Sequence, residues 1–552
     1  MPSVSPILSP IPYFLFSIPY SSRDFVVDAR CDRTGDRSSR LRIEKIRCKS
    51  IVPQLFLFRQ TIAITCGWLL VQLFTMLSVR AQQPQVAPPA PPAPLAAVCT
   101  SQISTAISAI IDRPELRRYR WGIVVQTLDG NTQLYNRDGD RLFIPASNVK
   151  LITTAVALRQ LGATTRLRTS VYQLPGNGNL SNLLVVGRGD PSLTVSGLQS
   201  IGQQLQQRGI KQIGQISFDD GYFRGEQING DWEWGDLSTD YAPAINGLML
   251  NQNSNPLTVS SQQVGMPLKY VWKDPSLNTW LVDNQSITVL ASQEGNISAT
   301  AIFGKPVIRL TGKLAIDAPP TQIDLPLADP AQSFISAFRQ TLIRSSIKID
   351  SVRSISGQST INLPELAAIN SPTISELITE TNQRSNNIYA EVLLKSIGRT
   401  HPQHYTSNED TSNLGIALVK QNLTSIGVDS QAYRLSDGSG LSRHNLVAPT
   451  AFVRVLSTMA TTPMGQIYRD SLPLSGTSGS LKNRMKGTVA QGIVRAKTGS
   501  LSGVASLSGY INPPQYSPLV FSIILNQHDR PTSQMTKVID EIMVVLARLK
   551  QC

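Results

Sequence analysis

Residues 145–158 read PASNVKLITTAVAL, and the interpretation of the whole chain starts from this stretch. Pro145 suits the start of a helix, where a missing N–H group costs nothing. The residues after it form helices well and place apolar side chains on one stripe. Ser147 and Lys150 are three residues apart, so a helix brings them to the same face. A serine with an amine one turn away can act as a nucleophile if burial or nearby cations deprotonate the lysine.

The motif S-x-x-K alone is weak evidence, because about two matches are expected by chance in a chain with this serine and lysine content. Residues 345–348 supply a second match, but IDSV follows them rather than a helical run. Two further motifs are therefore needed: SNN at residues 385–387, between two predicted helices, and KTGS at residues 497–500, on a predicted strand. KTG occurs once in the chain, whereas residues 276–278 supply another S-x-N.

The residue types in these motifs fit a hydrolytic site. Ser385 and Asn387 offer a hydroxyl and a carboxamide, usable for proton transfer and for holding a substrate amide. Lys497 and Thr498 on a strand present a cation and a hydroxyl to an anionic group, and Gly499 lets the backbone approach a ligand closely. Structural interpretations are also open: Ser385 as a helix cap and Lys497 as a solvated lysine on an edge strand.

The composition is that of a globular protein with two or three domains: 552 residues, of which 41% are hydrophobic and 16% charged. The net charge is +14, but eleven Lys/Arg and five Asp/Glu lie in residues 1–81, which leaves +8 on residues 82–552. Outside the N-terminal part no block of Lys/Arg occurs, so we expect no nucleic-acid partner. Anionic cell-envelope material is compatible with this charge.

The N-terminal part is typical of an exported protein. Three basic residues precede the apolar run 61–79, and SVRA at residues 78–81 offers a cleavage site after Ala81 in which Arg80 is unfavourable. We expect residues 1–81 to be an N-terminal extension with a cleaved signal peptide or a membrane anchor, and the protein to reach the periplasm or cell envelope. Membrane association would be peripheral or through residues 61–79. Residues 82–98 form a linker rich in Pro and Ala.

The remaining pattern predicts an α+β fold in which residues 99–164 and 362–552 form one catalytic domain. A β-rich insertion of two lobes, residues 165–361, divides it. A helix at 100–112 and a hairpin at 121–135 begin the domain. Short strands of the insertion are expected at 166–174, 183–187, 213–219, 287–290 and 299–310. After the insertion we expect helices at 373–381, 386–397, 410–423 and 450–459, antiparallel strands at 492–501, 504–511 and 519–525, and a last helix at 533–549.

Two cysteines follow the leader, Cys99 and Cys552, at the two ends of the predicted globular part. In an oxidising compartment they can form a disulfide that ties the ends together. Two unpaired thiols near frayed ends are the alternative, and spacing alone does not decide between them.

The three motifs occur in the order that is typical of penicillin-binding proteins and class A β-lactamases. Residues 100–550 further resemble the D-Ala-D-Ala carboxypeptidases of the penicillin-binding protein 4 type, peptidase family S13. The resemblance implies a serine β-lactamase-like transpeptidase fold, an antiparallel sheet with helices, split by the insertion. SNN departs from the common S-D-N form. The stretches that carry the resemblance are RGDPSL at 188–193, DGSGLSRHN at 437–445, LPLSG at 472–476, and GSL at 479–481 with Arg484.

The resemblance, transferred residue by residue, implies the roles of the reacting groups. Ser147 would attack the carbonyl of the D-Ala–D-Ala bond, and Lys150 would accept its proton. Ser385 would pass a proton to the departing amine, with Lys497 supplying positive charge nearby. Asn387 would orient the substrate.

It also implies how the substrate is bound. Thr498 would bind the terminal carboxylate, Gly499 would allow close approach, and the backbone N–H groups of Ser147 and Ser500 would form the oxyanion hole. Arg443 would either hold the substrate carboxylate or belong to a structural ion pair. The expected partners are peptidoglycan peptides ending in D-Ala–D-Ala, with β-lactam antibiotics as covalent inhibitors.

Other functions share parts of this pattern. A β-lactamase needs a water-activating carboxylate, and Glu391, just after Asn387, is interpreted as a surface residue. A peptidoglycan-binding protein without activity would not need both serines and both lysines. No G-x-S-x-G elbow occurs. His401 and His404 flank a proline and predict a surface loop rather than a metal site, so no metal or cofactor is expected. The balance between carboxypeptidase and endopeptidase action stays open.

Overall fold

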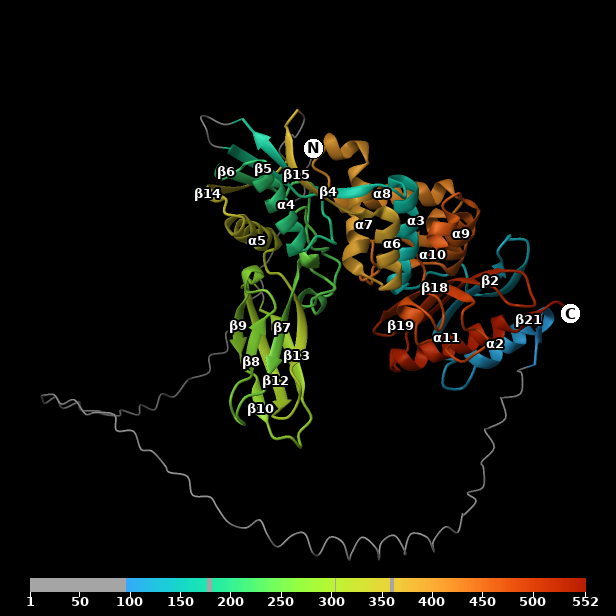
Figure 1. The fold of residues 1–552 in the computed structure, drawn as a ribbon. Helices are drawn as coiled ribbons and strands as arrows, with labels where there is room; N and C mark the ends of the chain where they lie inside the picture. The colour runs from blue at the N-terminus through green and yellow to red at the C-terminus, as the bar shows by residue number, and fades with distance from the viewer. Residues whose placement is uncertain (1–95, 176–180, 303, 358–361) are drawn as a thin grey trace, which may run out of the picture. The chain divides into compact units, whose positions relative to one another are not determined.

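The computed structural model describes residues 96–175, 181–302, 304–357 and 362–552 (Figure 1). The predicted signal peptide or anchor in residues 1–81 and most of the linker at 82–98 lie outside the described residues. Within the ranges that are described, no helix combines the length and the apolar character needed to cross a membrane.

A five-stranded antiparallel sheet forms the centre of the domain that contains Ser147. Because successive strand residues point to opposite faces, Ile123 and Val125 enter one core and Val124 enters the other. The three antiparallel strands predicted between residues 492 and 525 are confirmed as part of this sheet. In sheet order the strands are β18 Val494–Leu501, β19 Val504–Ile511, β20 Leu519–Asn526, β2 Arg120–Thr127 and β3 Gln133–Arg137.

Helices from the two ends of the described chain cover one face of this sheet. The helices α2 Ile103–Ile111 and α11 Thr532–Ala547 share a hydrophobic core with the strands, and Figure 1 shows them lying along the same side. The two ends are joined again by the parallel pair β1 Val98–Cys99 and β21 Leu549–Lys550. Cys99 and Cys552 form a disulfide beside it, so the paired alternative is the observed one.

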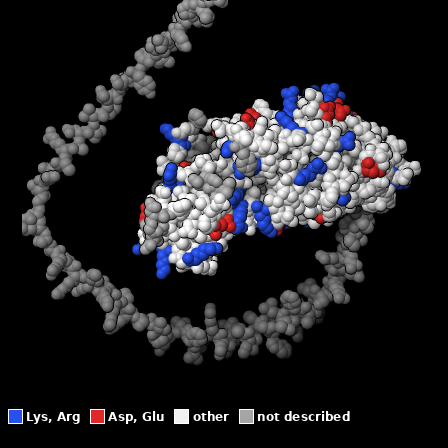
Figure 2. All heavy atoms as spheres, turned by 90° about the horizontal axis from the view of Figure 1, so that it is seen from above, with Lys and Arg blue, Asp and Glu red and all other residues white. Residues whose placement is uncertain are grey.

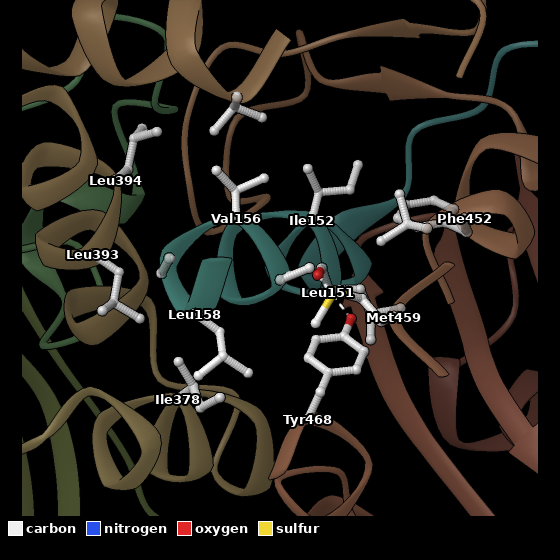
Figure 3. Close-up of a cluster of buried hydrophobic side chains, with 14 of the residues drawn as sticks. Leu151, Ile152, Val156, Leu158, Ile378, Leu393, Leu394, Phe452, Met459 and Tyr468 are labelled. Atoms are coloured by element: carbon white, nitrogen blue, oxygen red, sulfur yellow. Dashed lines mark hydrogen bonds between the residues drawn. The ribbon is translucent and has the colours of Figure 1, made fainter. Parts of the chain in front are cut away.

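Helix α3, Val149–Leu161, lies at the centre of the helical layer on the other face (Figure 3). The predicted apolar stripe of Leu151, Ala155 and Leu158 is buried, and so is every other residue from Val149 to Leu158, because neighbours surround the helix on all sides. The hydroxyl of Tyr468 donates a hydrogen bond of 2.8 Å to the carbonyl of Leu151. The other helices of this layer are α6 Ile374–Gln383, α7 Asn387–Arg399, α8 Thr411–Ser425, α9 Pro449–Thr461 and α10 Gly465–Asp470.

A second five-stranded sheet, of order β14-β6-β5-β4-β15, takes four strands from the predicted insertion at 165–361 and its last strand, β15, from residues beyond that boundary. Strands β5, β6 and β14 are parallel, and parallel neighbours need long crossover connections. The helices α4 Val195–Gln207 and α5 Pro330–Arg344 supply these crossovers, and the sequence analysis missed both. The strands are β4 Arg166–Leu174, β5 Ser181–Val186, β6 Gln212–Asp219, β14 Lys348–Ile355 and β15 Glu365–Thr373.

Shorter strands between β6 and α5 surround a separate hydrophobic core. The single strand predicted at 299–310 was wrong, because β11 and β12 are two antiparallel strands joined by a turn. Gly304 has a φ of +69° in that turn, where the chain reverses. The strands are β7 Ser254–Ser260, β8 Lys269–Trp272, β9 Leu281–Asn284, β10 Ile287–Val289, β11 Asn296–Ala301, β12 Val307–Ala315 and β13 Thr321–Pro326.

Charged side chains are dispersed rather than gathered on one face of the molecule. On the face drawn in Figure 2, groups of Lys and Arg are separated by uncharged residues and by smaller acidic groups. The positive charge on residues 82–552 is therefore not concentrated in one tract on that face.

Candidate active site

Ser147 lies in a strained turn just before α3. Ala146, Ser147 and Asn148 form a single 3₁₀ turn, so the α-helix begins later than Pro145 predicts. Ala146 has a φ of +50°, a left-handed conformation that costs about 1 kcal/mol for a residue with a side chain. Strand β19 holds the turn in place, because the hydroxyl of Ser506 donates to the carbonyl of Pro145 at 2.8 Å. The serine is therefore presented from a rigid support.

Lys150 is fully buried next to this serine. Its Nζ is 2.8 Å from Ser147 Oγ, 2.6 Å from Asn387 Oδ1 and 2.7 Å from the carbonyl oxygen of Ser439. Asn387 Nδ2 donates to the carbonyl of Tyr241 at 3.0 Å, which turns Oδ1 toward Lys150. Asn387 Oδ1 and the Ser439 carbonyl oxygen can only accept hydrogen bonds. A neutral Lys150 therefore donates its two N–H groups to them and directs its lone pair at the Ser147 hydroxyl.

The protonation of the two site lysines is shifted by their burial. Burial lowers the pKa of Lys150 to about 7, and the carboxylates of Asp437 and Glu391 oppose this shift. Burial also lowers the pKa of Lys497 well below its usual range, and the charge of Lys150 lowers it further. Near neutral pH a large fraction of Lys150 is therefore the neutral amine, the form that accepts a proton.

Ser385 and Lys497 form a second serine–lysine pair. Lys497 Nζ donates to Ser385 Oγ at 2.8 Å and to the carbonyl of Thr498 at 2.7 Å. Ser385 lies between α6 and α7 with a φ of +58°. Thr498 Oγ1 donates to Ser480 Oγ at 2.8 Å, so its hydroxyl is engaged with the turn after α10 in this structure. Asn387, two residues beyond Ser385 in the sequence, contacts Lys150 instead.

Two glycines let neighbouring backbone approach the Ser147 turn. A Cβ on Gly499 of β18 would lie 2.7 Å from the carbonyl oxygen of Pro145 and 3.1 Å from the backbone nitrogen of Ser147. A Cβ on Gly440 would lie 2.0 Å from the carbonyl oxygen of Ala146. Strand β18 thus runs directly beside the backbone of Ser147, and the next residue, Ser500, has an exposed side chain.

Arg443 is placed in an ion pair. Its Nε is 2.8 Å from Glu233 Oε1, and its guanidinium also donates to the carbonyl of Ser502 at 2.9 Å. Glu233 belongs to the loop of residues 220–253 between β6 and β7. Arg443 therefore forms the structural ion pair that was one of its two predicted roles. Through this residue the loop containing Glu233 is connected to the turn that follows β18.

The interpretation of Glu391 as a surface residue was wrong. Its side chain is 4% exposed, and its carboxylate accepts hydrogen bonds from the backbone N–H groups of Gly438 and Ser439. The spacing of four residues from Asn387 places both on one face of α7, a signal that the sequence contained. The burial of Glu391 could not be inferred from the local sequence, because the loop that covers it lies almost fifty residues further along the chain.

The surface-loop prediction also fails for His404, whose side chain is buried. Together with Arg399 and Arg224, burial lowers the pKa of His404 to about 4. Among the residues that the structure describes, no group of three or more His, Cys, Asp or Glu side chains could hold a metal ion.

The fold is that of penicillin binding protein 4. The structure resembles penicillin binding protein 4 from Haemophilus influenzae, with a TM-score of 0.70 and 22% sequence identity. The similarity covers 80% of this chain and 98% of that one.

Residues 103–549 match the family described as the D-Ala-D-Ala carboxypeptidase 3 (S13) family. A D-alanyl-D-alanine carboxypeptidase from Actinomadura sp. (strain R39) is 32% identical over 464 residues, covering 81% of this chain and 85% of that protein. A penicillin-sensitive carboxypeptidase A from Dictyostelium discoideum is 28% identical over 461 residues, covering 78% and 87%. The chain belongs to the S13 family and is a serine-type D-Ala-D-Ala carboxypeptidase, a hydrolase.

Proposed function

We propose that the chain removes the terminal D-Ala from peptidoglycan stem peptides that end in D-Ala–D-Ala, through an acyl-enzyme on Ser147. The observation that carries this proposal is the hydrogen bonding of Lys150. Its Nζ lies 2.8 Å from Ser147 Oγ, while Asn387 Oδ1 and the Ser439 carbonyl accept its N–H groups. A base whose lone pair is held toward a serine hydroxyl is what nucleophilic catalysis requires.

The proposed reaction has two halves. In acylation, Ser147 Oγ attacks the carbonyl carbon of the penultimate residue, and its proton moves to Lys150 Nζ. The backbone N–H groups of Ser147 and Ser500 receive the oxyanion, each donor being worth about 3 kcal/mol of barrier. The departing amine takes the proton that Lys150 accepted, passed on through Ser385, which Lys497 holds, and free D-Ala leaves. Water then hydrolyses the ester, which regenerates the serine and releases the shortened peptide.

Other side chains are proposed to hold the substrate. Thr498 is proposed to bind the terminal carboxylate, whose negative charge would favour the protonated form of Lys497 against the effect of its burial. Asn387 is proposed to orient the substrate amide, in addition to its hydrogen bond to Lys150. A substrate carboxylate at Arg443 would have to compete with Glu233, which already pairs with that guanidinium.

The same chemistry supports two extensions of the proposal. Endopeptidase action on cross-links uses the same steps, because such links also follow a D-Ala carbonyl. β-Lactams would acylate Ser147 and leave slowly, which makes them covalent inhibitors. A β-lactamase is less well supported, because Glu391 accepts backbone hydrogen bonds from the loop instead of facing the serine ester.

We also propose that the protein is exported to the periplasm or cell envelope, where its substrate lies. The disulfide between Cys99 and Cys552 supports this, since such bonds persist in oxidising compartments. Residues 61–79 would anchor the protein if that segment is not cleaved.

The test measures the intact mass of the protein before and after benzylpenicillin, alongside Ser147→Ala. A stable penicilloyl adduct that is absent from the variant, together with release of D-Ala from a pentapeptide, is the expected result. No adduct and no turnover would leave a peptidoglycan-binding protein on this fold. Fast turnover of penicillin without an adduct would indicate a β-lactamase.

A further inference from the structure

Two peptide units of the loop between β16 Tyr433–Arg434 and β17 Leu446–Val447 lie between helices α7 and α3. On the α7 side, Glu391 accepts the N–H of Gly438 at 3.1 Å and that of Ser439 at 2.8 Å. On the α3 side, the hydroxyl of Thr153 donates to the Gly438 carbonyl at 2.7 Å. The Ser439 carbonyl accepts from Lys150 Nζ, also at 2.7 Å. The loop thus connects the buried carboxylate to the lysine beside Ser147.

We propose that Glu391 is a positioning residue for acyl transfer: it holds the backbone of Ser439, whose carbonyl contacts Lys150, and stabilises the ammonium that Lys150 forms on taking the Ser147 proton. This inference goes beyond the assigned roles of the three motifs. It rests on the proposed function, in which Lys150 is the base that accepts this proton.

The positioning part follows from how the two peptide units are held. The peptide unit between Gly438 and Ser439 has its N–H bound to Glu391 and its carbonyl bound to Thr153 of α3, so rotating it breaks a bond on each side. The next unit carries the Ser439 carbonyl, bound to Lys150, and the Gly440 N–H, bound to Asp437. If the Ser439 carbonyl turned away, Lys150 would keep one carbonyl partner, Asn387, and its lone pair would lose its fixed direction. Burial makes such a loss costly, because each polar group left without a partner costs about 1–3 kcal/mol.

The electrostatic part follows from the reaction itself. Proton transfer from Ser147 creates a cation on Lys150 in a site that excludes solvent, next to the second buried lysine, Lys497. Two buried carboxylates, Asp437 and Glu391, act in the opposite direction and raise the pKa of Lys150. Asp437 is surrounded by neutral donors, and its oxygens accept hydrogen bonds from Gly440 N, Ser442 N, Asn445 Nδ2 and Trp232 Nε1.

Several charged groups lie around Glu391. Burial and the neighbouring Asp437 raise the pKa of Glu391 to about 7, so the carboxylate is increasingly ionised above that pH. Lys150 faces it from α3 and Lys395 from the next turn of α7. On its other side is a cavity of about 270 Å³, whose charged lining consists of Glu226, Asp231, Glu391, Lys395 and Asp410.

The test compares variants of the full chain by the second-order rate of acylation with benzylpenicillin between pH 5.5 and 9. Glu391→Gln keeps an oxygen for the two N–H groups and removes the charge. We expect the acidic limb of its profile to move down by less than one pH unit, because losing a nearby negative charge lowers the pKa of Lys150, but Glu391 is itself partly protonated below pH 7. The plateau should fall about tenfold, because the forming ammonium is less stabilised.

Two further variants separate charge from packing. Glu391→Asp keeps the charge on a shorter side chain, so its limb should stay at the wild-type pH while its plateau falls. Glu226→Gln removes an exposed carboxylate from the same cavity and should leave the profile unchanged. Thermal unfolding of each variant checks its fold, and if Glu391→Gln does not fold, the profile of Glu391→Asp decides.

Several outcomes overturn the inference. A folded Glu391→Gln with the wild-type limb and plateau would show that the carboxylate does not act on Lys150. Equal losses of plateau in the Gln and Asp variants, with neither limb displaced, would reduce Glu391 to a packing role. If only Glu391→Asp can be measured, a plateau equal to that of the wild type would likewise reduce Glu391 to a packing role. If the wild-type protein forms no adduct at any pH, the proposed function itself fails and this inference fails with it.

Discussion

Replacing Gly499 by alanine is expected to remove most of the activity without unfolding the protein. The added Cβ would lie 2.2 Å from Ser506 Oγ and 2.7 Å from the carbonyl oxygen of Pro145. The Ser506 hydroxyl can rotate, but it then loses its 2.8 Å hydrogen bond to that carbonyl. The carbonyl belongs to the backbone, so the Ser147 turn or β18 must move by about 0.7 Å to restore an ordinary van der Waals separation.

The magnitude follows from what moves. The backbone N–H of Ser147 is a proposed oxyanion donor, and the same added Cβ would lie 3.1 Å from its nitrogen. A misplacement of about 1 Å at a reacting centre costs on the order of 100-fold in rate. This corresponds to about 2.7 kcal/mol of transition-state stabilisation. Because Gly499 does not have a positive φ, the loss would come from these contacts and not from backbone strain.

The assay follows the penicilloyl adduct by intact mass against time, with thermal unfolding measured in parallel. Gly230→Ala is the matched control, because a Cβ at Gly230 meets no atom within 4 Å and its φ is not left-handed. Acylation of Gly499→Ala within twofold of the wild-type rate, at unchanged thermal stability, would refute the reasoning. It would mean that β18 does not constrain the Ser147 turn.

Two further predictions concern pH and the disulfide. Acylation should rise with pH to a plateau, with a midpoint near 7, because burial lowers the pKa of Lys150 to about 7 and protonation below that pH removes the base. Lys150→Arg, which keeps its proton, should lose about 10³-fold in rate, whereas the exposed Lys486→Arg should not. A wild-type rate that still climbs steeply at pH 9 would contradict this. Cys552→Ser should lower the free energy of unfolding by about 2–4 kcal/mol in urea titrations, since it removes the bond to Cys99. Identical unfolding curves would show that the bond adds no stability.

Much of the fold was predictable because the signals are local. Alternation and helical periodicity identified β18, β19, β20 and α11 within a few residues of their observed bounds. The two missed helices show where such signals fail. In α4, glycines weaken the helical pattern, yet Gly202 is needed where a Cβ would lie 3.2 Å from Thr341 of α5. A close approach between two helices cannot be seen within a single window of sequence.

The candidate site was predictable in its reacting groups for a similar reason. The spacings of S-x-x-K, S-x-N and K-T-G select pairs that the structure joins by hydrogen bonds, Ser147 with Lys150 and Ser385 with Lys497. The groups that orient them were not predictable. For example, the backbone carbonyl of Tyr241 accepts the hydrogen bond that orients Asn387. Every residue has such a carbonyl, so the sequence does not indicate which one takes this role.

The sequence by itself therefore determined the class of enzyme and selected the serine–lysine pairs for which catalytic roles are proposed, because short motifs lie on predictable helices and strands that preserve their spacing. Only the tertiary structure decided that Lys150 is buried with a pKa near 7, and that Glu391 is an interior carboxylate rather than a surface one. The reason is that desolvation depends on which distant segments cover a side chain. Here the loop containing Gly438 and Ser439 encloses both groups, and its place between α3 and α7 is set by long-range packing.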